Sequence, residues 1–378
     1  MEQSVDGAAA GAGRGAAGWV NHNLGGAMHM GRSMGMAAAL VLGLGLVACG
    51  GGEKPKEAGA DSASTAMAAK LGGDGKLTIA VIGKSSTNPV FLSARTGAEA
   101  AAAELTKKYG VPIEVAWLTP PQEDGQVQAQ RITQAANEGA DAILLSASDA
   151  GKVQGAVDDV VSRGIPVMTF DSDVAGSKRF AYYGVDDVQT GETVMAELAK
   201  ALNGKGNVAI LAGNQNAPNL QKRVQGVKQE AAKYPGIKIV GVFNHIETPQ
   251  DAAAEVIRVK NAYPSVNAWA MVGGWALFTT SLLDDLDPKL VKIVSVDALP
   301  AELPYVEKGL TPVLLAQPTY EWGHLGVTTI VEHILDNKQT PALIPMTLVK
   351  VTKDNLGEWA RQLKAWGFTD VPDKYLQM

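Results

Sequence analysis

The sequence predicts an α/β fold of two similar Rossmann-like lobes, each built around a parallel β-sheet. From Lys76 onward, short apolar runs alternate with longer amphipathic runs, the pattern of strands and helices in a parallel sheet. The alternation restarts near the middle of the chain, where EGADAILLSAS (138–148) and PSVNAWAMVGG (264–274) share one local plan. With 378 residues, of which 46% are hydrophobic, the chain can form two cores.

The first series of elements occupies residues 76–170. Its short apolar runs predict buried strands, and the longer segments between them have the periodicity of amphipathic helices. The expected strands are 76–83, 112–117, 141–146 and 165–170, and the expected helices are 89–109, 123–139 and 151–164.

The second series repeats this plan and is followed by a tail. Its expected strands are 180–185, 207–213, 237–243, 268–273 and 291–297, and its expected helices are 187–202, 217–234, 250–262 and 275–286. The tail has expected strands at 311–317 and 346–351 and expected helices at about 320–336 and 354–366. We expect the last helix, within LGEWARQLKAWGF, to pack on one lobe because it is amphipathic, although a contact with a partner is the alternative.

An apolar run at residues 34–48 precedes the only cysteine of the chain, Cys49. The run has the length of a signal-peptide core and is short for a membrane-spanning helix. The residues Leu-Val-Ala-Cys at 46–49 resemble the bacterial lipobox, whose cysteine is acylated. We therefore expect a leader and lipoprotein signal peptide at 1–49, lipidation at Cys49 and a flexible tether at 50–75. A buried structural cysteine is the alternative, but the surrounding segment offers no core.

Composition and missing motifs argue against several classes of protein. The net charge of −6 provides no basic footprint, so we expect no nucleic-acid partner. One cysteine allows no disulfide and the five histidines form no HExxH motif, so we expect neither a metal nor a cofactor. The expected first strand ends in GKSSTNP, which lacks the GxGxxG turn of a dinucleotide-binding fold. GGDGKLT lacks the spacing of a phosphate-binding loop, and the sequence contains no GxSxG motif of the kind that holds a nucleophilic serine.

Asp171 and Asp173 are paired carboxylates that could serve acid–base catalysis. We expect them to point the same way, because residues two apart on an extended segment share a face. Turn aspartates that only accept hydrogen bonds are commoner, so the sequence favours binding over catalysis.

The loops that follow the predicted strands carry polar, amide-bearing or aromatic residues. In open α/β sheets, ligands lie beyond the carboxyl ends of the strands. Amides and carboxylates form hydrogen bonds with hydroxyl groups, and aromatic faces pack on the C–H face of a sugar ring. The pattern predicts a site for a neutral polyol.

Several segments from Lys76 to about Val351 resemble, in their order and spacing, the periplasmic sugar-binding proteins of the ribose-binding type. They are NPVF at 88–91, GADAILLSASD, GIPVMTFDSD, YYGVDDVQTGE, QKRVQGV, VSVDALP and LLAQPTYEWGHLGV. The resemblance implies a hinge-bending receptor that captures a sugar between two lobes and delivers it to an ATP-driven importer. It also implies three crossings between lobes, near residues 185, 317 and 348. The expected lobes are 76–185 with 318–348, and 186–317 with 349–378.

The resemblance also implies particular ligand contacts. Six residues match the family's binding positions: Asn88, Phe91, Asp171, Arg223, Asp297 and Gln317. Four further candidates lie at or just after the ends of predicted strands: Trp117, Asp173, Asn214 and Trp275. An arginine fork paired with carboxylates suits vicinal hydroxyls. Two departures put ribose itself in doubt: Asp171-Ser172 stands where ribose binders have Asp-Arg, and VGGW at 272–275 where they have Asn-Asp.

Each candidate also has a packing interpretation. Phe91 and Trp275 are candidates for the core, and Asn88 for the cap of a helix whose first residue is proline. Arg223 is alternatively a solvated helix charge and Asp297 a helix N-cap. Trp117 and Trp322 are alternatively lobe-packing residues.

Together with the lipobox-like residues, the resemblance implies sugar capture by a monomeric, lipid-anchored binding protein of the periplasm or cell envelope, working with ABC permease subunits. A lipid-anchored sensor for chemotaxis or two-component signalling is the alternative. A sugar-responsive transcription regulator would need a DNA-reading module in place of the leader and tether. An enzyme would turn over the sugar that it binds.

Overall fold

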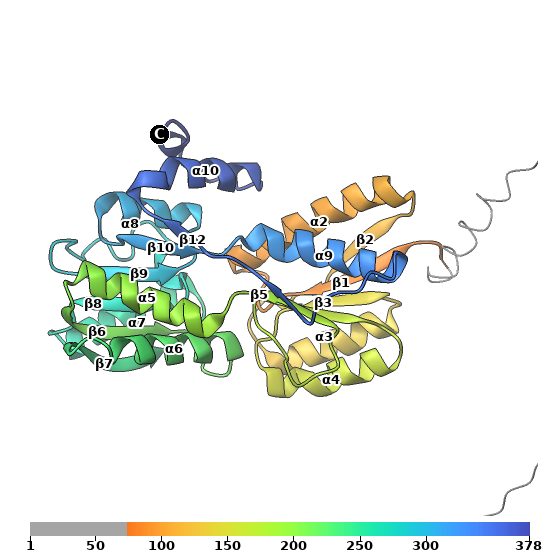
Figure 1. Cartoon of the computed structure of the whole chain (residues 1–378), viewed down its shortest axis with the longest axis horizontal. Helices are drawn as coiled ribbons and strands as arrows, with labels where there is room; N and C mark the ends of the chain where they lie inside the picture. The colour runs from red at the N-terminus through yellow and green to blue at the C-terminus, as the bar shows by residue number, and fades with distance from the viewer. Residues whose placement is uncertain (1–73) are drawn as a thin grey trace, which may run out of the picture. The chain divides into compact units, whose positions relative to one another are not determined.

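The computed structural model describes residues 74–378, which form two β-sheets covered by helices (Figure 1). The predicted leader with Cys49, and the predicted tether up to residue 73, lie outside the described residues. Both sheets have six strands. The α/β fold with two parallel-sheet lobes is therefore confirmed.

The sheet of the first lobe is parallel throughout, with strand order β11-β5-β4-β3-β1-β2. Its strands are β1 (Leu77–Ile82), β2 (Ile113–Trp117), β3 (Ala142–Leu145), β4 (Val167–Phe170), β5 (Ala181–Gly184) and β11 (Leu343–Pro345). Its helices are α2 (Pro89–Tyr109), α3 (Gly125–Asn137), α4 (Ala150–Ser162) and α9 (Thr319–Leu335). Because helices cover both faces, β3, β4 and β5 are buried at every residue, as their uninterrupted apolar runs predict.

The sheet of the second lobe has the order β12-β10-β9-β8-β6-β7 and is parallel except for β12. Its strands are β6 (Lys205–Ala212), β7 (Gly236–Asn244), β8 (Ala268–Met271), β9 (Lys292–Val296), β10 (Val313–Ala316) and β12 (Val349–Val351). Its helices are α5 (Asp187–Ala201), α6 (Pro218–Ala231), α7 (Pro249–Ala262), α8 (Leu303–Lys308), α10 (Leu356–Ala365) and α11 (Asp373–Leu376). The chain passes from one sheet to the other between β5 and β6, between β10 and β11, and between β11 and β12.

The expected helix at 275–286 is wrong. The structure has a single 3-10 turn, η1 (Trp275–Leu277), followed by turns up to β9. Thr279, Thr280 and Ser281 disfavour a helix because their short or branched polar side chains restrict rotamers or compete for backbone hydrogen bonds. The apolar residues of this segment recur with the spacing of a helix, but its residue types do not favour helix formation.

Helices α2, α3 and α4 begin at capped residues that follow the preceding strand by four to seven residues. The Asn88 side chain accepts a hydrogen bond from the Val90 N–H at 3.2 Å, and Pro89 follows at the first helical position of α2. Asp124 and Asp149 cap α3 and α4 in the same way. The caps fix the helix starts at the carboxyl edge of the sheet, where loops from several strands converge.

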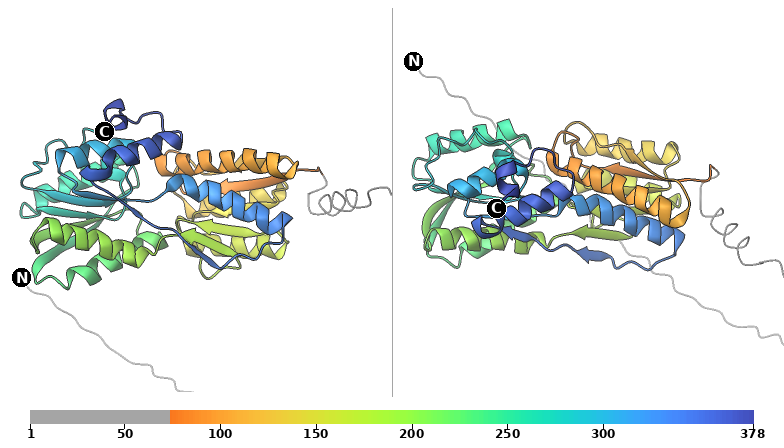
Figure 2. Two further views of the ribbon diagram at one scale, coloured as in Figure 1. Left: turned by 45° about the horizontal axis from the view of Figure 1, so that its top comes forward. Right: turned by 90° about the horizontal axis from the view of Figure 1, so that it is seen from above.

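The C-terminal segment contacts both lobes, so the expectation that it packs on one lobe is incomplete. The Trp359 indole of α10 donates to the Ala298 carbonyl of the second lobe at 2.7 Å. The Trp366 ring, just after α10, stacks on Tyr320 of α9, in the first lobe, with centroids 5.9 Å apart and planes 3° apart. The views in Figure 2 show α10 beside the second lobe, next to the start of α9.

Each lobe contains one helix pair that approaches closely through glycines. Helices α2 and α9 lie side by side in the first lobe, and α5 and α6 in the second (Figure 1). A Cβ atom added at Gly191 of α5 would lie 1.9 Å from the Arg223 carbonyl oxygen of α6. At Gly323 of α9 it would lie 1.8 Å from the Ala94 carbonyl of α2. Only residues without a side chain allow this spacing.

We predict that Gly191→Ala destabilises the protein by about 1–3 kcal/mol, because the added methyl group must push α6 away from α5. Chemical denaturation measures this loss. Gly155→Ala in α4 is the matched control: a Cβ there meets nothing within 4 Å, so helix propensity should stabilise it by roughly 0.5–1 kcal/mol. Equal stability of the two variants would contradict the close packing of α5 and α6.

Candidate functional site

A small cavity lies where loops from both lobes meet, and we call it the inner cavity. Its volume is about 20 Å³, close to the space that one water molecule needs. Its lining is polar and aromatic and comes from both lobes: Lys84, Asn88, Val90, Phe91, Asp171, Asn219, Leu220, Arg223, Glu247, Gly273, Trp275, Asp297, Gln317 and Trp322. In this arrangement the lobes are closed on each other.

Asp171 joins the two lobes. Its carboxylate accepts a hydrogen bond from the Ser146 hydroxyl of the first lobe at 2.8 Å and one from the Asn219 amide of the second lobe at 3.0 Å. The Lys84 ammonium and the Arg223 guanidinium each lie 3.8 Å from its oxygens. The side chain is 5% exposed, so water does not replace these partners. Asp171 is a buried acceptor shared between the lobes.

Asp171 and Asp173 do not point the same way, and that expectation is wrong. Asp171 has a φ of 54°, in the left-handed region, which breaks the extended geometry assumed for the pair. Asp173 instead accepts hydrogen bonds from the Thr169 hydroxyl and the Arg179 guanidinium, each at 2.6 Å. The two carboxylates therefore serve different partners, and Asp173 does not line the inner cavity.

Arg223 is a buried residue, not a solvated helix charge. Its Nε donates to Asp187 at 2.9 Å, Nη1 to the Val272 carbonyl at 3.1 Å, and Nη2 to the Gln317 side chain at 3.1 Å. Burial raises the pKa of the Asp187 carboxyl to about 6, although the charge of Arg223 opposes this shift. The guanidinium therefore donates mainly to acceptors of the protein itself.

Asp297 and Gln317 form the wall of the cavity in the second lobe. The Gln317 amide donates to one Asp297 oxygen at 3.0 Å, and the Gly274 N–H donates to the other at 3.1 Å. Asp297 has a φ of 78° and precedes no helix that it could cap, because the next turn begins at Pro300. Its interpretation as an N-cap is wrong. Burial raises the pKa of the Asp297 carboxyl, while Gln317 and Arg223 oppose this shift.

Aromatic side chains supply the apolar surface of the cavity. Phe91 and Trp322 stack in the first lobe with centroids 6.0 Å apart, and Phe91 also meets the edge of Phe170. Trp275 faces the cavity from the second lobe, with the His245 ring 5.2 Å from it. Phe91 is thus both a core residue and a lining residue, so its two interpretations are compatible.

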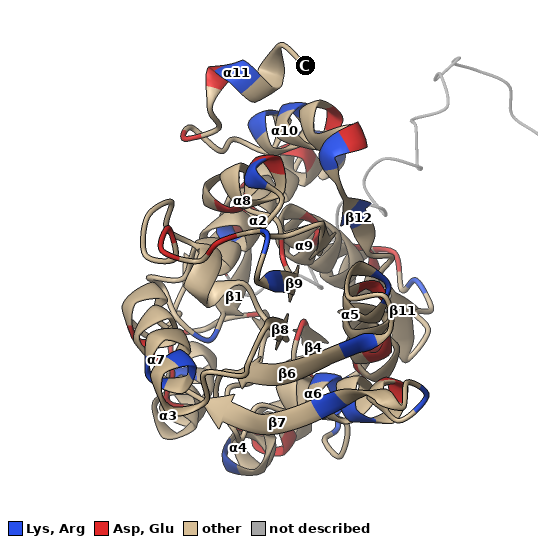
Figure 3. Cartoon of the chain, turned by 90° about the vertical axis from the view of Figure 1, so that its left-hand side faces the viewer, with Lys and Arg blue, Asp and Glu red and all other residues tan. Residues whose placement is uncertain are grey.

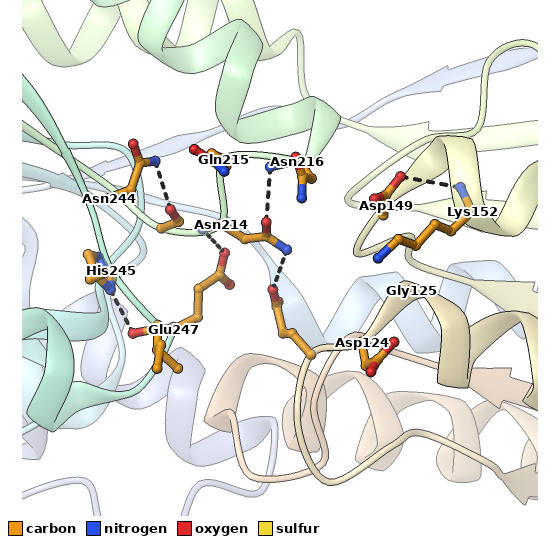
Figure 4. A pocket seen from close by; sticks show the side chains of 13 residues that line it. Asp124, Gly125, Asp149, Lys152, Asn214, Gln215, Asn216, Asn244, His245 and Glu247 are labelled. Atoms are coloured by element: carbon orange, nitrogen blue, oxygen red, sulfur yellow. Dashed lines mark hydrogen bonds between the residues drawn. The ribbon is translucent and has the colours of Figure 1, made fainter.

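A larger pocket of about 600 Å³, the outer pocket, lies beside the inner cavity and shares Glu247 with it (Figure 4). The Asn214 side chain donates to Glu123 of the first lobe at 3.1 Å, and the Asn214 N–H donates to Glu247 at 2.9 Å. Asn214 therefore links a carboxyl group from each lobe. It lines the outer pocket and not the inner cavity.

Seven of the ten predicted contacts line the inner cavity: Asn88, Phe91, Asp171, Arg223, Trp275, Asp297 and Gln317. Trp117 does not, and instead lies half-buried under the Arg95 guanidinium, which is 5.6 Å from its ring. Lys84, Asn219, Glu247 and Trp322 also line the cavity but were not among the predicted contacts. The position of Lys84, two residues after β1, could have identified it as a candidate ligand contact.

Among residues 74–378, no group of three or more His, Cys, Asp and Glu side chains is placed to hold a metal ion. None of the helices in this range is long and apolar enough to cross a bilayer. In the view of Figure 3, acidic and basic residues are interspersed along α6, α10 and α11.

The fold and the cavity together define a class of protein. Two parallel-sheet lobes, joined by three chain segments, close around a polar cavity to which both contribute. This is the architecture of a receptor that encloses a small molecule between two hinged lobes. The family described as periplasmic binding protein domain matches residues 79–339, and the chain belongs to this family.

Individual relatives support this assignment. The xylitol-binding protein of Mycolicibacterium smegmatis is 30% identical over 210 residues, which are 54% of this chain and 52% of that protein, so the match spans about half the relative's length. The ribose import binding protein of Escherichia coli is 25% identical over 286 residues, 74% of this chain and 91% of the relative. A solved ABC transporter solute-binding protein of Burkholderia graminis, in complex with D-arabinose, is 29% identical with a TM-score of 0.69, over 75% of this chain and 97% of that one.

These relatives are binding proteins and not enzymes. They confirm the resemblance to periplasmic sugar-binding proteins and the expectation that the chain is not an enzyme.

The contact between the lobes at the outer pocket includes two facing carboxyl groups. Burial, and then the charge of Glu247, raise the pKa of Glu123 well above its usual value of 4.5, while Lys84 and the Asn214 amide oppose the shift. A carboxyl whose pKa is raised in the folded protein binds its proton more tightly there than in the unfolded chain. The free energy of unfolding therefore falls as pH rises from 4.5 through the raised pKa of Glu123.

We predict that Glu123→Gln flattens this part of the pH dependence, because the neutral amide imitates the protonated carboxyl. The free energy of unfolding, measured by urea titration from pH 4.5 upward, should fall less steeply in the variant than in the wild type. The control is Asp124→Asn, which removes a neighbouring exposed carboxylate and keeps a side chain suited to capping α3. The same pH slope in wild type and Glu123→Gln would contradict the raised pKa.

Proposed function

We propose that the protein is the substrate-binding lipoprotein of an ABC importer, and that it captures a pentose, a hexose or a related polyol between its lobes. The main support is the inner cavity, which combines carboxylates, amides and cations from both lobes with three aromatic rings. Hydroxyl groups bind to such acceptors and donors, and aromatic faces bind to the apolar face of a sugar. The named relatives bind xylitol, ribose and D-arabinose.

Binding requires the lobes to open first. A cavity of about 20 Å³ holds one water molecule and has no room for a sugar. The direct bond between Asp171 and Asn219 closes the gap in this arrangement. In the proposed cycle the lobes separate at the three chain crossings, the sugar takes the place of such bonds, and the lobes close over it. The proposed contacts are Asn88, Phe91, Asp171, Arg223, Trp275, Asp297 and Gln317.

The proposed location is the periplasm or cell envelope, with the protein held at a membrane by lipidated Cys49. The family and the relatives support an extracytoplasmic place. The lipobox-like residues at 46–49 support the anchor. A lipid-anchored sensor remains the second candidate; it uses the same cleft and differs in its partner, a signalling receptor in place of the permease.

Sugar binding should raise the melting temperature, because a ligand that binds only the folded state adds RT ln(1 + [L]/Kd). At a sugar concentration of 100 Kd the gain is about 2.7 kcal/mol. We predict such a shift with at least one of xylitol, D-ribose, D-arabinose, D-allose and D-tagatose, measured by thermal unfolding. An amino acid and a nucleoside serve as negative controls. The proposed substrate class would be contradicted if a control solute raised the melting temperature and none of the sugars did.

We predict that Cys49→Ala releases the protein from membranes, because the variant has no sulfur to acylate. In a bacterial host, the wild type should incorporate labelled palmitate and partition into the detergent phase of Triton X-114. The variant should do neither. Ser62→Ala, in the predicted tether, is the control and should behave as the wild type. Equal membrane association of Cys49→Ala and wild type would contradict a lipid anchor.

A further inference from the structure

A third cavity, which we call the C-terminal pocket, shares no lining residue with the inner cavity or the outer pocket. Its volume is about 340 Å³, within the range of small-molecule sites and equal to that of about eleven water molecules. Three parts of the chain form its walls: residues 89–96 of α2 in the first lobe, Phe278 with residues 299–301 in the second lobe, and residues 366–370 after α10.

The end of helix α10 builds one wall of this pocket. Gly367 has a φ of 91°, and the N–H groups of Gly367 and Phe368 donate to the Lys364 and Leu363 carbonyls at 3.1 Å each. This left-handed helix end reverses the chain, so that Phe368 packs against the cores of both lobes. The wall at 366–370 lies beyond residues 79–339, which match the family.

The lining of the C-terminal pocket is largely apolar. The rings of Phe278, Trp366 and Phe368 contribute to it, and Leu92, which is 44% exposed, lies at its rim. Among the described residues that line the pocket, Asp370 alone carries a charge, and it is exposed. Apolar and aromatic linings of this size with few polar groups suit uncharged, largely apolar ligands.

Ser93 places one polar group at the floor of the pocket. It is 4% exposed, and among the described residues its hydroxyl has no hydrogen-bond partner. Thr96, further along α2, differs because its hydroxyl donates to the Leu92 carbonyl at 3.1 Å. Buried hydroxyl groups are usually paired, because an unpaired one loses its hydrogen bonds with water without replacement. A ligand with one hydrogen-bonding group would restore that pairing at Ser93.

We propose that the C-terminal pocket binds a small, uncharged ring compound with one hydrogen-bonding group, which pairs with Ser93, and that its occupation favours the closed arrangement of the lobes. Leu92 lies on the wall from the first lobe and Phe278 on the wall from the second, so a rotation of the lobes changes the distance between the walls. A ligand that contacts both walls binds the closed form more tightly and shifts the population toward it.

The probe for this site is indole, a fused ring with one N–H donor, and its counterpart is indene, which has the same ring shape without the N–H. Isothermal titration calorimetry measures both with the wild type and three variants. Ala301→Phe fills the pocket from the second lobe, where Ala301 is half-buried in its lining. Ala254→Phe is the matched control, since Ala254 is exposed on α7 of the same lobe. Ser93→Ala removes the hydroxyl and adds no bulk.

We expect indole to bind the wild type and Ala254→Phe, and not Ala301→Phe. Ser93→Ala should bind indole roughly 3- to 10-fold more weakly, since one neutral hydrogen bond is lost, and should bind indene as the wild type does. The proposal is overturned if indole does not bind the wild type or binds Ala301→Phe equally well. Equal losses of indole and indene affinity in Ser93→Ala, or no loss of either, would overturn the pairing with Ser93.

The charge of the ligand is tested with indole-5-carboxylate. It should bind more weakly than indole, because Asp370 at the rim repels its carboxylate. Equal or tighter binding of the carboxylate would overturn the preference for uncharged ligands.

The effect on closure is measured with spin labels at Lys152→Cys and Asn216→Cys, exposed positions of the two lobes on the outer pocket (Figure 4). A Cys49→Ala background confines labelling to these two cysteines. Saturating indole should shift the distances from double electron–electron resonance to shorter values, and should not do so with Ala301→Phe added. An unchanged distribution would overturn the effect on closure. These tests use no sugar, so a failure of the sugars to bind would contradict the proposed function alone.

Discussion

The closed cleft depends on the interactions that the Asp171 carboxylate makes with both lobes. It accepts a hydrogen bond from each lobe, from Ser146 and from Asn219, and two buried cations face it. A buried carboxylate is costly unless hydrogen bonds and charges compensate it, and here part of that compensation comes from the opposite lobe. Closure therefore satisfies Asp171, while opening exposes it to water. A hydroxyl group is both donor and acceptor, so a polyol can take over the bonds on both sides at once.

Each lobe places one carboxylate in the inner cavity by the same backbone geometry. Asp171 follows β4, the fourth strand of the first lobe along the chain, and Asp297 follows β9, the fourth strand of the second. Both have positive φ values, 54° and 78°, which residues with a Cβ rarely adopt. Such strain persists only where the surroundings hold it and tends to mark functional sites. Here it turns each carboxylate out of its strand direction and into the inner cavity.

The sequence predicts the elements well and the contacts between lobes poorly. Apolar runs and their spacing locate the strands because burial on both faces imposes a local pattern. The expected helix at 275–286 fails because helical spacing of apolar residues does not form a helix where residues such as Thr279 to Ser281 disfavour it. Lys84 and Asn219 are 135 residues apart, so their meeting depends on how the lobes close, and no local pattern encodes it. The same holds for Arg223: its type and place suggest a ligand fork, but only the fold brings Asp187 and Gln317 to its donors.

The C-terminal segment limits how the lobes can move. Trp359 fixes α10 to the second lobe, and Trp366 stacks on Tyr320 of the first. Tyr320 lies three residues after Gln317, close to a chain crossing. A rotation displaces a point in proportion to its distance from the axis, so a contact beside the crossings moves less than the groups at the far rim of the cleft. The stack can therefore persist through small rotations while Asn214 and Glu123 separate at the outer pocket, which makes hinge bending compatible with an extra contact between lobes.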